Sequence, residues 1–180
     1  EQAGILNFLT EQKTAVINGA AGTGKTMIAV EKAHRHAMSG EKVLFLCYNN
    51  KLKTYLSENY PEEYVDYYTV AGLACKICNT TTPDYSKLKA NLGDMYLAES
   101  FPYQHVIVDE YQDTNYLQEQ IYFRIASYVK DNNGSITIVG DDDQSLYRFR
   151  GANVSLFINY VERISASVRI KPNIVYLHEN

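Results

Sequence analysis

The sequence predicts an α/β fold in one domain, with a parallel sheet that carries helices on both faces. Six short apolar or β-branched runs recur along the 180 residues and are separated by helix-length stretches. These runs are continuously apolar rather than alternating, which is typical of strands buried on both faces. Strands that alternate with helices imply right-handed crossovers and parallel pairing. No internal repeat or long linker divides the chain, so we expect one domain over residues 1–180.

The elements follow from these patterns in chain order. The predicted strands are 14–18, 43–47, 65–70, 105–109, 135–140 and 173–177. The clearest predicted helices are 24–38, 113–129 and 153–163. In the second of these helices, one inward face is predicted by the helical spacing of Leu117, Ile121, Ile125 and Tyr128. The segment 79–103 opens on a Thr-Pro turn, and we expect a surface excursion there.

Composition excludes several classes of protein. With 46% apolar residues, ten Gly and four Pro, the chain is neither disordered nor collagen-like. No apolar run approaches the roughly 18 residues of a membrane span, so we expect no membrane partner. Three cysteines without an export signal predict reduced thiols and a cytoplasmic location. Cys75 and Cys78 form a CxxC, but no second ligand pair follows, which favours structural thiols over a zinc site or redox pair.

The net charge of −4 is unevenly distributed. Basic residues exceed acidic ones within 13–53 and within 148–180, whereas acidic residues dominate 54–147. A fold that joined the two basic stretches would form a positive strip on an acidic body, although ordinary solvated charge explains the same pattern.

The strongest motif is GAAGTGKT, which lies between the first predicted strand and the first predicted helix. It matches the phosphate-binding P-loop pattern GxxxxGKT in the strand-to-helix context that this pattern requires. Backbone N–H groups of such a loop curl around a phosphate, and the helix N-terminus adds positive partial charge. We therefore expect ATP and Mg²⁺, with Lys25 at the β- and γ-phosphates and the Thr26 hydroxyl on Mg²⁺. The expected loop residues are Gly19, Ala20, Ala21, Gly22, Thr23, Gly24, Lys25 and Thr26.

Two further predicted strands end in acidic residues. In VIVDEYQD (106–113), the carboxylates of Asp109 and Glu110 follow a strand at the edge where open α/β sheets bind ligands. We expect Asp109 to hold Mg²⁺ and Glu110 to act as general base on the attacking water. In IVGDDDQSLYRFRGA (138–152), Gln144 is placed to sense a γ-phosphate. The interleaved aromatic and Arg residues that follow suit contact with a single nucleic-acid strand.

Together these motifs resemble the first motor domain, called 1A, of superfamily 1 helicases of the UvrD/Rep/PcrA type. GAAGTGKT resembles motif I, VDEYQDT resembles motif II, and VGDDDQSLYRFRGA resembles motif III. LFLCYNNKL (44–52) resembles motif Ia, and YTVAGLA (68–74) resembles a degraded motif Ib. The likeness covers Gln2 to Asn180 and implies a RecA-like P-loop NTPase fold with ATP hydrolase and DNA helicase activity.

The resemblance also implies roles for individual residues. The catalytic group would be Lys25, Glu110 and Gln144. Gln2 would hydrogen-bond adenine, Arg150 would lie close to the nucleotide, and Gln112 would couple motif II to motif III. The single-stranded DNA contacts would be Tyr48, Asn50, Thr69, Tyr147 and Phe149, with Phe149 at the position of a base-stacking Trp in relatives.

The chain departs from this family's pattern in three places. Val70 and Ala71 replace an aromatic-His pair after the motif Ib Thr, which argues against a DNA contact there. The 28 residues from Cys75 to Pro102 are too few for the large 1B insertion, so we expect that insertion to be minimal or absent. The chain ends at YLHEN, where motif IV and its arginine finger begin in relatives. We therefore expect a fragment of a longer helicase whose partner is a second RecA-like domain, and slow ATP turnover without it.

The leading interpretation is the ATP-binding motor domain of a UvrD-like DNA helicase or translocase that moves 3′ to 5′ on single-stranded DNA. The alternative is a nucleotide-gated nucleic-acid-binding module without unwinding activity, which the decay of motif Ib and the small 1B region favour slightly. A P-loop kinase or GTPase is a poor third choice, because the chain has no guanine-reading motif such as NKxD.

Overall fold

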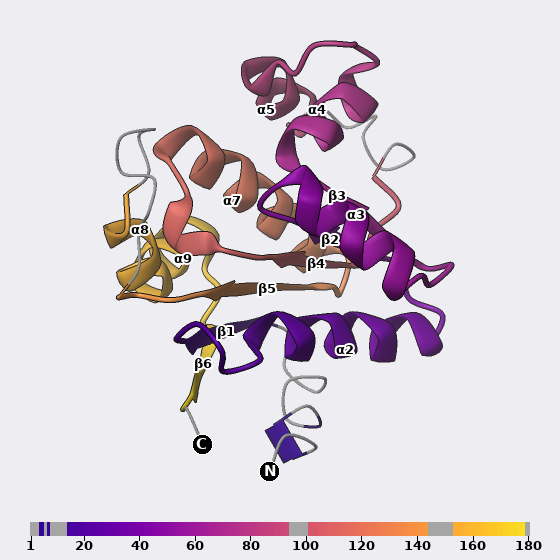
Figure 1. Ribbon diagram of the computed structural model, residues 1–180. Helices are drawn as coiled ribbons and strands as arrows, with labels where there is room; N and C mark the ends of the chain where they lie inside the picture. The colour runs from indigo at the N-terminus through magenta and orange to yellow at the C-terminus, as the bar shows by residue number, and fades with distance from the viewer. Residues whose placement is uncertain (1–3, 6, 8–13, 94–100, 144–152, 179–180) are drawn as a thin grey trace.

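The computed structural model describes residues 4–5, 7, 14–93, 101–143 and 153–178 (Figure 1). The strands are β1 (Thr14–Gly19), β2 (Val43–Leu46), β3 (Val65–Tyr68), β4 (His105–Val108), β5 (Ser135–Gly140) and β6 (Asn173–Leu177). The α-helices are α2 (Lys25–Met38), α3 (Asn50–Asn59), α4 (Val70–Cys78), α5 (Tyr85–Asn91), α7 (Tyr116–Asp131), α8 (Ser155–Ile158) and α9 (Tyr160–Val168). A short 3₁₀ turn, η1 (Tyr111–Asp113), follows β4.

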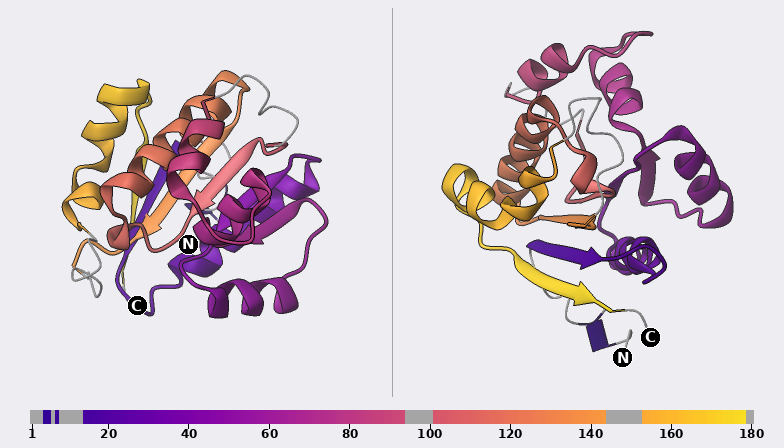
Figure 2. Two further views of the ribbon diagram at one scale, coloured as in Figure 1. Left: turned by 90° about the horizontal axis from the view of Figure 1, so that it is seen from above. Right: turned by 60° about the vertical axis from the view of Figure 1, so that its left-hand side comes forward.

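The strands form one sheet in the order β3-β2-β4-β5-β1-β6, and every neighbouring pair is parallel. Strands β3 and β6 are therefore the two edges. In Figure 2, α4 and α5 stand at the β3 side of the molecule, and β6 lies at the opposite side. The predicted α/β fold with a parallel sheet is confirmed.

Both faces of the sheet are covered, as continuously apolar strands require. Alternate residues such as Leu44, Val106 and Ile136 pack with α4, α5, α7, α8 and α9 on one face. The intervening residues, such as Phe45 and Ile107, pack with α2 and α3 on the other face. Figure 1 shows α7 and α2 on opposite sides of β4 and β5. The sheet is thus the central layer between two apolar cores.

Three local predictions need correction. The strand predicted at 65–70 ends at Tyr68, because the Thr69 hydroxyl accepts a hydrogen bond from the Gly72 amide at 3.0 Å and starts α4. The helix predicted at 153–163 is divided at Asn159 into α8 and α9. The helical spacing predicts Leu117 on the inward face of α7, but 36% of its surface is exposed. The residues that α7 buries include Ile121, Tyr122, Ile125, Ala126 and Val129.

The segment predicted as a surface excursion, 79–103, contains both exposed and buried residues. Residues 80–87 are mostly exposed, and the Asp84 carboxylate accepts from the Lys87 amide at 3.0 Å to begin α5. Leu88 and Phe101 are fully buried and belong to the core on the α7 face. Helix α5 therefore packs as part of the domain between α4 and α7.

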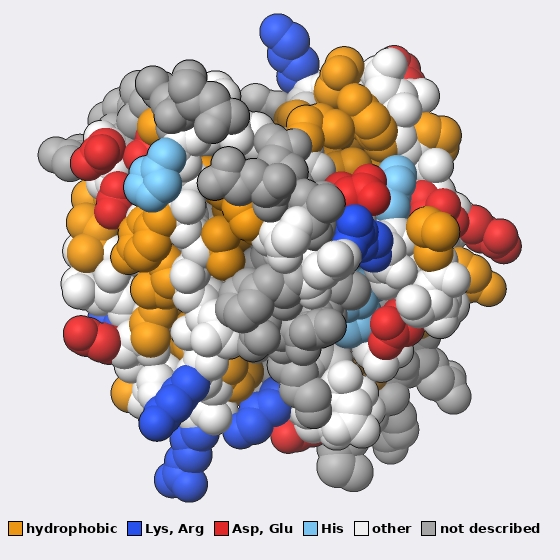
Figure 3. Space-filling view, turned by 90° about the horizontal axis from the view of Figure 1, so that it is seen from below, with side chains coloured by type: hydrophobic (Ala, Val, Ile, Leu, Met, Phe, Trp, Pro, Cys, Tyr) orange, Lys and Arg blue, Asp and Glu red, His pale blue; other side chains and the backbone are white. Residues whose placement is uncertain are grey.

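Within the described part of the chain, no helix combines the length and apolar character needed to cross a bilayer. Figure 3 shows one face of the molecule, on which Lys and Arg side chains lie at separate places among acidic and apolar ones. On this face the basic residues do not form a continuous positive strip. The cysteines Cys47, Cys75 and Cys78 are free thiols.

Candidate active site

Three candidate segments meet at one rim of the sheet because their strands are parallel. Val108 is in register with Ile138, and Asn18 is in register with Gly140. The chain leaves β1 into the P-loop, leaves β4 into Asp109 and Glu110, and leaves β5 into Asp141. Carboxyl ends of parallel strands are the usual ligand-binding edge of such sheets. The distant sequence motifs are thereby brought to one place.

The P-loop is shaped by glycine and by an internal hydrogen bond. Gly24 has a left-handed backbone conformation with φ 79°, which a side chain would strain, and α2 begins at the next residue. The Thr23 hydroxyl donates to the Ala20 carbonyl at 2.7 Å and closes the loop. A Cβ at Gly19 would lie 2.6 Å from that hydroxyl oxygen, so the loop requires glycine there. These features present the loop in front of the 14-residue helix α2.

Thr26 and Asp109 are in direct contact. The Thr26 hydroxyl donates to Asp109 Oδ2 at 3.1 Å, although 83 residues separate them in sequence. Asp109 is buried, and this burial raises its pKa to about 6, with the Glu110 charge acting in the same direction. The Thr26 hydrogen bond and the Lys25 charge act against this rise. A buried carboxylate beside a hydroxyl is an oxygen donor set that suits Mg²⁺, and the positive charge of Lys25 is close enough to act on the same carboxylate.

A cavity of about 510 Å³ joins the P-loop to the acidic pair. Its walls include Lys25 and Thr26 from one side and Glu110 from the other. Lys25 is itself buried, with 7% of its surface exposed. The amine and the carboxylate that the sequence assigned to one pocket therefore do lie around a common cavity, which is the size of a small-molecule site.

Glu110 is held by its neighbour Gln112. The Gln112 side-chain amide donates to Glu110 Oε2, and its carbonyl oxygen accepts from the Asp141 backbone amide at 3.1 Å. Gln112 is buried, so this amide links motif II to the end of β5 within the protein interior. Glu110 has φ 52°, an uncommon conformation for a residue with a side chain, and such residues concentrate at functional sites.

The described DNA-contact candidates lie beside this pocket. Tyr48 lines the 510 Å³ cavity, and with Thr69 it also lines a second cavity of about 130 Å³ that reaches Asp109 and Glu110. Asn50 is exposed at the first position of α3. The candidate DNA contacts and the candidate catalytic acid thus share one edge of the sheet.

Five predicted site residues lie outside the described residues. They are Gln2, Gln144, Tyr147, Phe149 and Arg150. Their assignments stay predictions from the resemblance.

The sequence reasoning missed two residues at the cavity wall. Asp113 lines both cavities, and Asn49 lines the larger one while its side chain caps α3 through the Leu52 amide at 2.8 Å. Asp113 belongs to the same VIVDEYQD motif as Glu110, which is the signal that could have identified it. Asn49 sits next to Tyr48 at a strand-to-helix turn, where a capping Asn is the expected signal.

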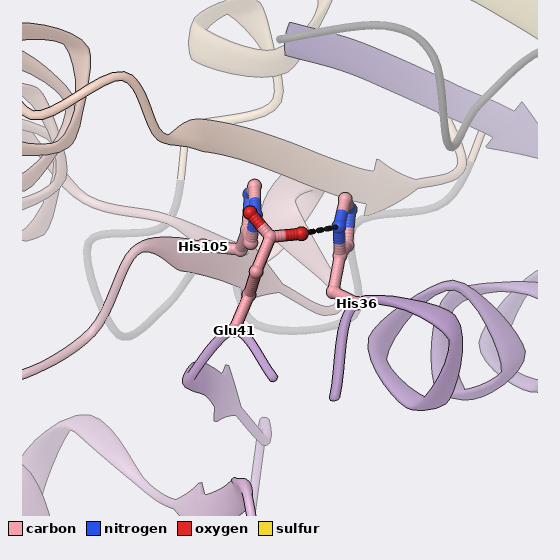
Figure 4. Close-up of side chains that lie close together, drawn as sticks. All are labelled: His36, Glu41 and His105. Carbon is pink, nitrogen blue, oxygen red and sulfur yellow. Dashed lines mark hydrogen bonds and ion pairs between the residues drawn. The ribbon is translucent and has the colours of Figure 1, made fainter. Parts of the chain in front are cut away.

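A separate cluster lies at the opposite rim of the sheet, where β4 and β5 begin (Figure 4). The rings of His36 and His105 stack with centroids 3.6 Å apart, and the Glu41 carboxylate lies 3.4 Å from His36 Nδ1 and 3.0 Å from His105 Nε2. Lys32 Nζ is 3.4 Å from His36 Nε2, and Ser135 Oγ is 2.7 Å from His105 Nδ1.

The three side chains of His36, Glu41 and His105 bring their possible ligand atoms within 4.8 Å of one another. A metal ion lies in the plane of each imidazole that binds it, and two rings stacked at 18° do not share such a point nearby. The geometry therefore fits a buried hydrogen-bonded cluster rather than a metal centre.

Comparison with solved structures supports the fold. The chain superposes on Pif1 helicase from Candida albicans with a TM-score of 0.61 and 12% identity, over 99% of this chain and 39% of that one. It superposes on the replication initiator DnaA, solved with AMPPCP and single-stranded DNA, with a TM-score of 0.52 and 14% identity, over 99% and 44%. At these identities the likeness concerns the fold, which is that of P-loop NTPases.

Sequence comparison identifies closer relatives. One polypeptide of the ATP-dependent helicase/nuclease from Ligilactobacillus salivarius is 39% identical over 94 residues, which are 52% of this chain and 7% of that polypeptide. The same-named polypeptide from Staphylococcus aureus is 45% identical over 71 residues, which are 38% of this chain and 6% of that polypeptide. The chain thus spans a small part of these relatives.

The family match covers most of the domain. The UvrD/REP helicase N-terminal domain matches residues 47–164, or 118 of 180 residues, and includes the acidic pair and Gln112. The matched range begins after the P-loop, which is identified by its own motif and geometry. The chain belongs to the UvrD/REP helicase N-terminal domain family.

Proposed function

We propose that this chain is the ATP-binding motor domain of a DNA helicase or translocase that moves 3′ to 5′ along single-stranded DNA. The observation that carries the proposal is the shared cavity, in which Lys25 and the Thr26–Asp109 pair face Glu110. A P-loop, a buried carboxylate and a second carboxylate around one cavity are the parts that ATP hydrolysis uses.

The P-loop and Asp109 would bind the nucleotide and its metal ion. Backbone amides of residues 19–26 and the N-terminus of α2 would surround the phosphates, with Lys25 contributing a full positive charge. Thr26 and Asp109 would hold Mg²⁺, which supplies charge neutralisation at the phosphate oxygens. The raised pKa of Asp109 reflects a buried carboxylate with little compensating positive charge, and a cation fits that environment.

Glu110 would orient and deprotonate the attacking water. Its carboxylate lines the cavity, and the Gln112 amide holds one of its oxygens in place. Because Gln112 also accepts from the Asp141 amide, a shift at the end of β5 would reach the general base through one side chain. This connection would couple nucleotide state to the segment that carries the predicted residues Gln144 and Phe149.

Single-stranded DNA would cross the same rim. Tyr48 and Thr69 line the cavity next to Glu110, and Asn50 is exposed nearby on α3. Aromatic rings stack on bases and polar groups contact the backbone in proteins that move along a single strand. Proximity of this rim to Glu110 supports coupling between strand contact and hydrolysis.

A second RecA-like domain would complete the motor by supplying an arginine finger, which contributes roughly 10³–10⁵ in rate in other NTPases. The isolated 180 residues would therefore bind ATP·Mg²⁺ weakly and turn it over slowly. The alternative, a nucleotide-gated binding module, draws support from Val70, whose buried side chain cannot meet DNA as an aromatic-His pair would.

The deciding experiment measures ATPase and strand displacement by the parent protein on duplexes with a 3′ or a 5′ single-stranded tail. The motor proposal predicts DNA-stimulated hydrolysis and displacement with the 3′ tail only. ATP-dependent binding to both tails without displacement would favour the binding module. Displacement that starts from the 5′ tail would contradict the proposed direction.

A further inference from the structure

Tyr68 gathers two lysines at the edge of the sheet. It is the last residue of the edge strand β3 and directly precedes Thr69. Lys76 Nζ donates to Tyr68 Oη at 2.9 Å and lies 5.0 Å from the ring centroid. Lys53 Nζ lies 6.0 Å from the same centroid. The three side chains come from β3, α4 and α3, so three separate elements build this cluster.

The cluster keeps donors available for a ligand. Each ammonium group has three N–H donors, and the hydrogen bond to Tyr68 occupies one donor of Lys76. Lys76 is exposed, whereas Lys53 and Tyr68 are half-buried. The ring thus fixes two flexible cations near each other, which lowers the entropic cost of holding them for a phosphate.

Two acidic residues lie nearby and define the limits of the cluster. The Asp66 carboxylate is engaged by Tyr103, whose hydroxyl donates to it at 2.6 Å. Glu62 lines the same hollow of about 290 Å³ as Lys53 and Tyr68. The positive charge available to a ligand is therefore concentrated at Lys53 and Lys76, with Tyr68 between them.

The position of the cluster matters because motif Ib has lost its usual side chains. Val70 is buried and Ala71 is small, so neither offers an aromatic or cationic contact after Thr69. Tyr68 stands immediately before Thr69 and brings an aromatic ring with two cations to the same edge. The lost contact and the added cluster lie on either side of one residue.

We infer that Lys53, Tyr68 and Lys76 form a binding site for the phosphate backbone of single-stranded DNA, extending its path from Tyr48 and Thr69 to the β3 edge. This inference rests on the proposed function. The two ammonium groups bind consecutive phosphates, and the Tyr68 hydroxyl holds one of them in position. Affinity at this site is electrostatic and depends on salt, with little preference for base sequence.

The test is fluorescence anisotropy of a labelled oligodeoxythymidylate with the 180-residue chain, at several salt concentrations, with and without a non-hydrolysable ATP analogue. The double variant K53Q/K76Q is compared with K171Q, which removes an exposed lysine just before β6 on the opposite rim. Losing two phosphate contacts on a single strand reduces the slope of log K against log salt by about 1.4. Between about 50 and 200 mM salt, wild type is then expected to lose about 7-fold more affinity than the double variant.

The outcomes separate this site from the proposed function. Weaker binding with a reduced salt slope in K53Q/K76Q, and wild-type behaviour in K171Q, support the site. Wild-type affinity and slope in K53Q/K76Q overturn the site and leave the proposed function intact. If the wild-type chain binds no oligonucleotide at low salt in either nucleotide state, the DNA part of the proposed function fails together with the site. Thermal unfolding of each variant confirms that the compared proteins are folded.

Discussion

The hydroxyl of Thr26 donates a hydrogen bond to the carboxylate of Asp109 at 3.1 Å, which joins the start of α2 to the end of β4. This contact crosses β5, the strand that lies between β1 and β4 in the sheet. It places the expected Mg²⁺ ligands together before any ligand is bound. The same contact makes several properties of the chain measurable.

Replacing Asp109 with Asn is expected to stabilise the ligand-free chain while weakening Mg²⁺-dependent nucleotide binding. Because the pKa of Asp109 is raised to about 6, the folded state binds a proton more tightly there than the unfolded state. The wild-type chain therefore loses stability as the pH rises from about 4 to about 6. D109N should be more stable by about 3 kcal/mol or less at pH 8, with little difference below about pH 4. Urea unfolding of both proteins at several pH values measures this, and a less stable D109N at pH 8 would contradict it.

Replacing Glu110 with Gln is expected to preserve ATP binding and to lower the rate of hydrolysis. The amide keeps the shape of the side chain and cannot accept a proton, and general-base catalysis contributes about 10²–10⁴ in rate. Single-turnover hydrolysis and ATP affinity are measured in parallel, with exposed Glu63→Gln as the matched control. Hydrolysis at the wild-type rate in E110Q would remove Glu110 from the proposed role.

Replacing Gln112 with Ala is expected to reduce both stability and hydrolysis. The change leaves the Asp141 amide without the partner that it has in the wild-type interior and frees the Glu110 carboxylate. An unsatisfied buried polar group costs about 1–3 kcal/mol of unfolding free energy. A double-mutant cycle with E110Q should show coupled rather than additive loss of rate. Exposed Gln120→Ala is the control, and additive effects of Q112A and E110Q would argue against the connection.

The stacked histidines are expected to make stability depend on pH in the opposite sense to Asp109. Burial lowers the pKa of His36 from 6.5 to about 4, with Lys32 and His105 charges acting the same way and Glu41 opposing them. Burial also lowers the pKa of His105. The unfolded state binds more protons between about pH 4 and 6.5, so stability rises with pH in this window.

The variant His36→Gln should flatten this rise relative to wild type, whereas exposed His178→Gln should not. Comparing the shape of the two curves separates the histidine effect from that of Asp109, which remains in both proteins. An unchanged slope in H36Q between about pH 4 and 6.5 would show that His36 does not titrate differently in the two states.

The sequence predicted the sheet and the phosphate loop because these depend on local patterns. Continuous apolar runs such as 135–140 allow few alternatives to a buried strand, and GAAGTGKT carries its own strand and helix context. Local patterns were less informative at element ends. Thr69 reads as part of a β-branched strand, yet its hydroxyl starts a helix.

Long-range pairings could not be predicted in this way. The stack of His36 on His105 joins residues far apart in the chain, and neither lies in a motif. The same holds for Tyr68 and its two lysines, which meet only because α3 and α4 flank the edge strand. Sequence spacing reveals contacts along one element, whereas contacts between elements require the fold.

The central claim, that Lys25, Thr26, Asp109 and Glu110 surround one ATP·Mg²⁺ site, is tested most directly by titrating the 180-residue chain with a fluorescent ATP analogue. The titration is run with and without Mg²⁺ on wild type, Lys25→Met and the control Lys42→Met, whose lysine is exposed. Binding is expected to require Mg²⁺, to fall by about 100-fold or more in K25M, and to persist in K42M. Binding that is independent of Mg²⁺ and equal in K25M and wild type would contradict the claim.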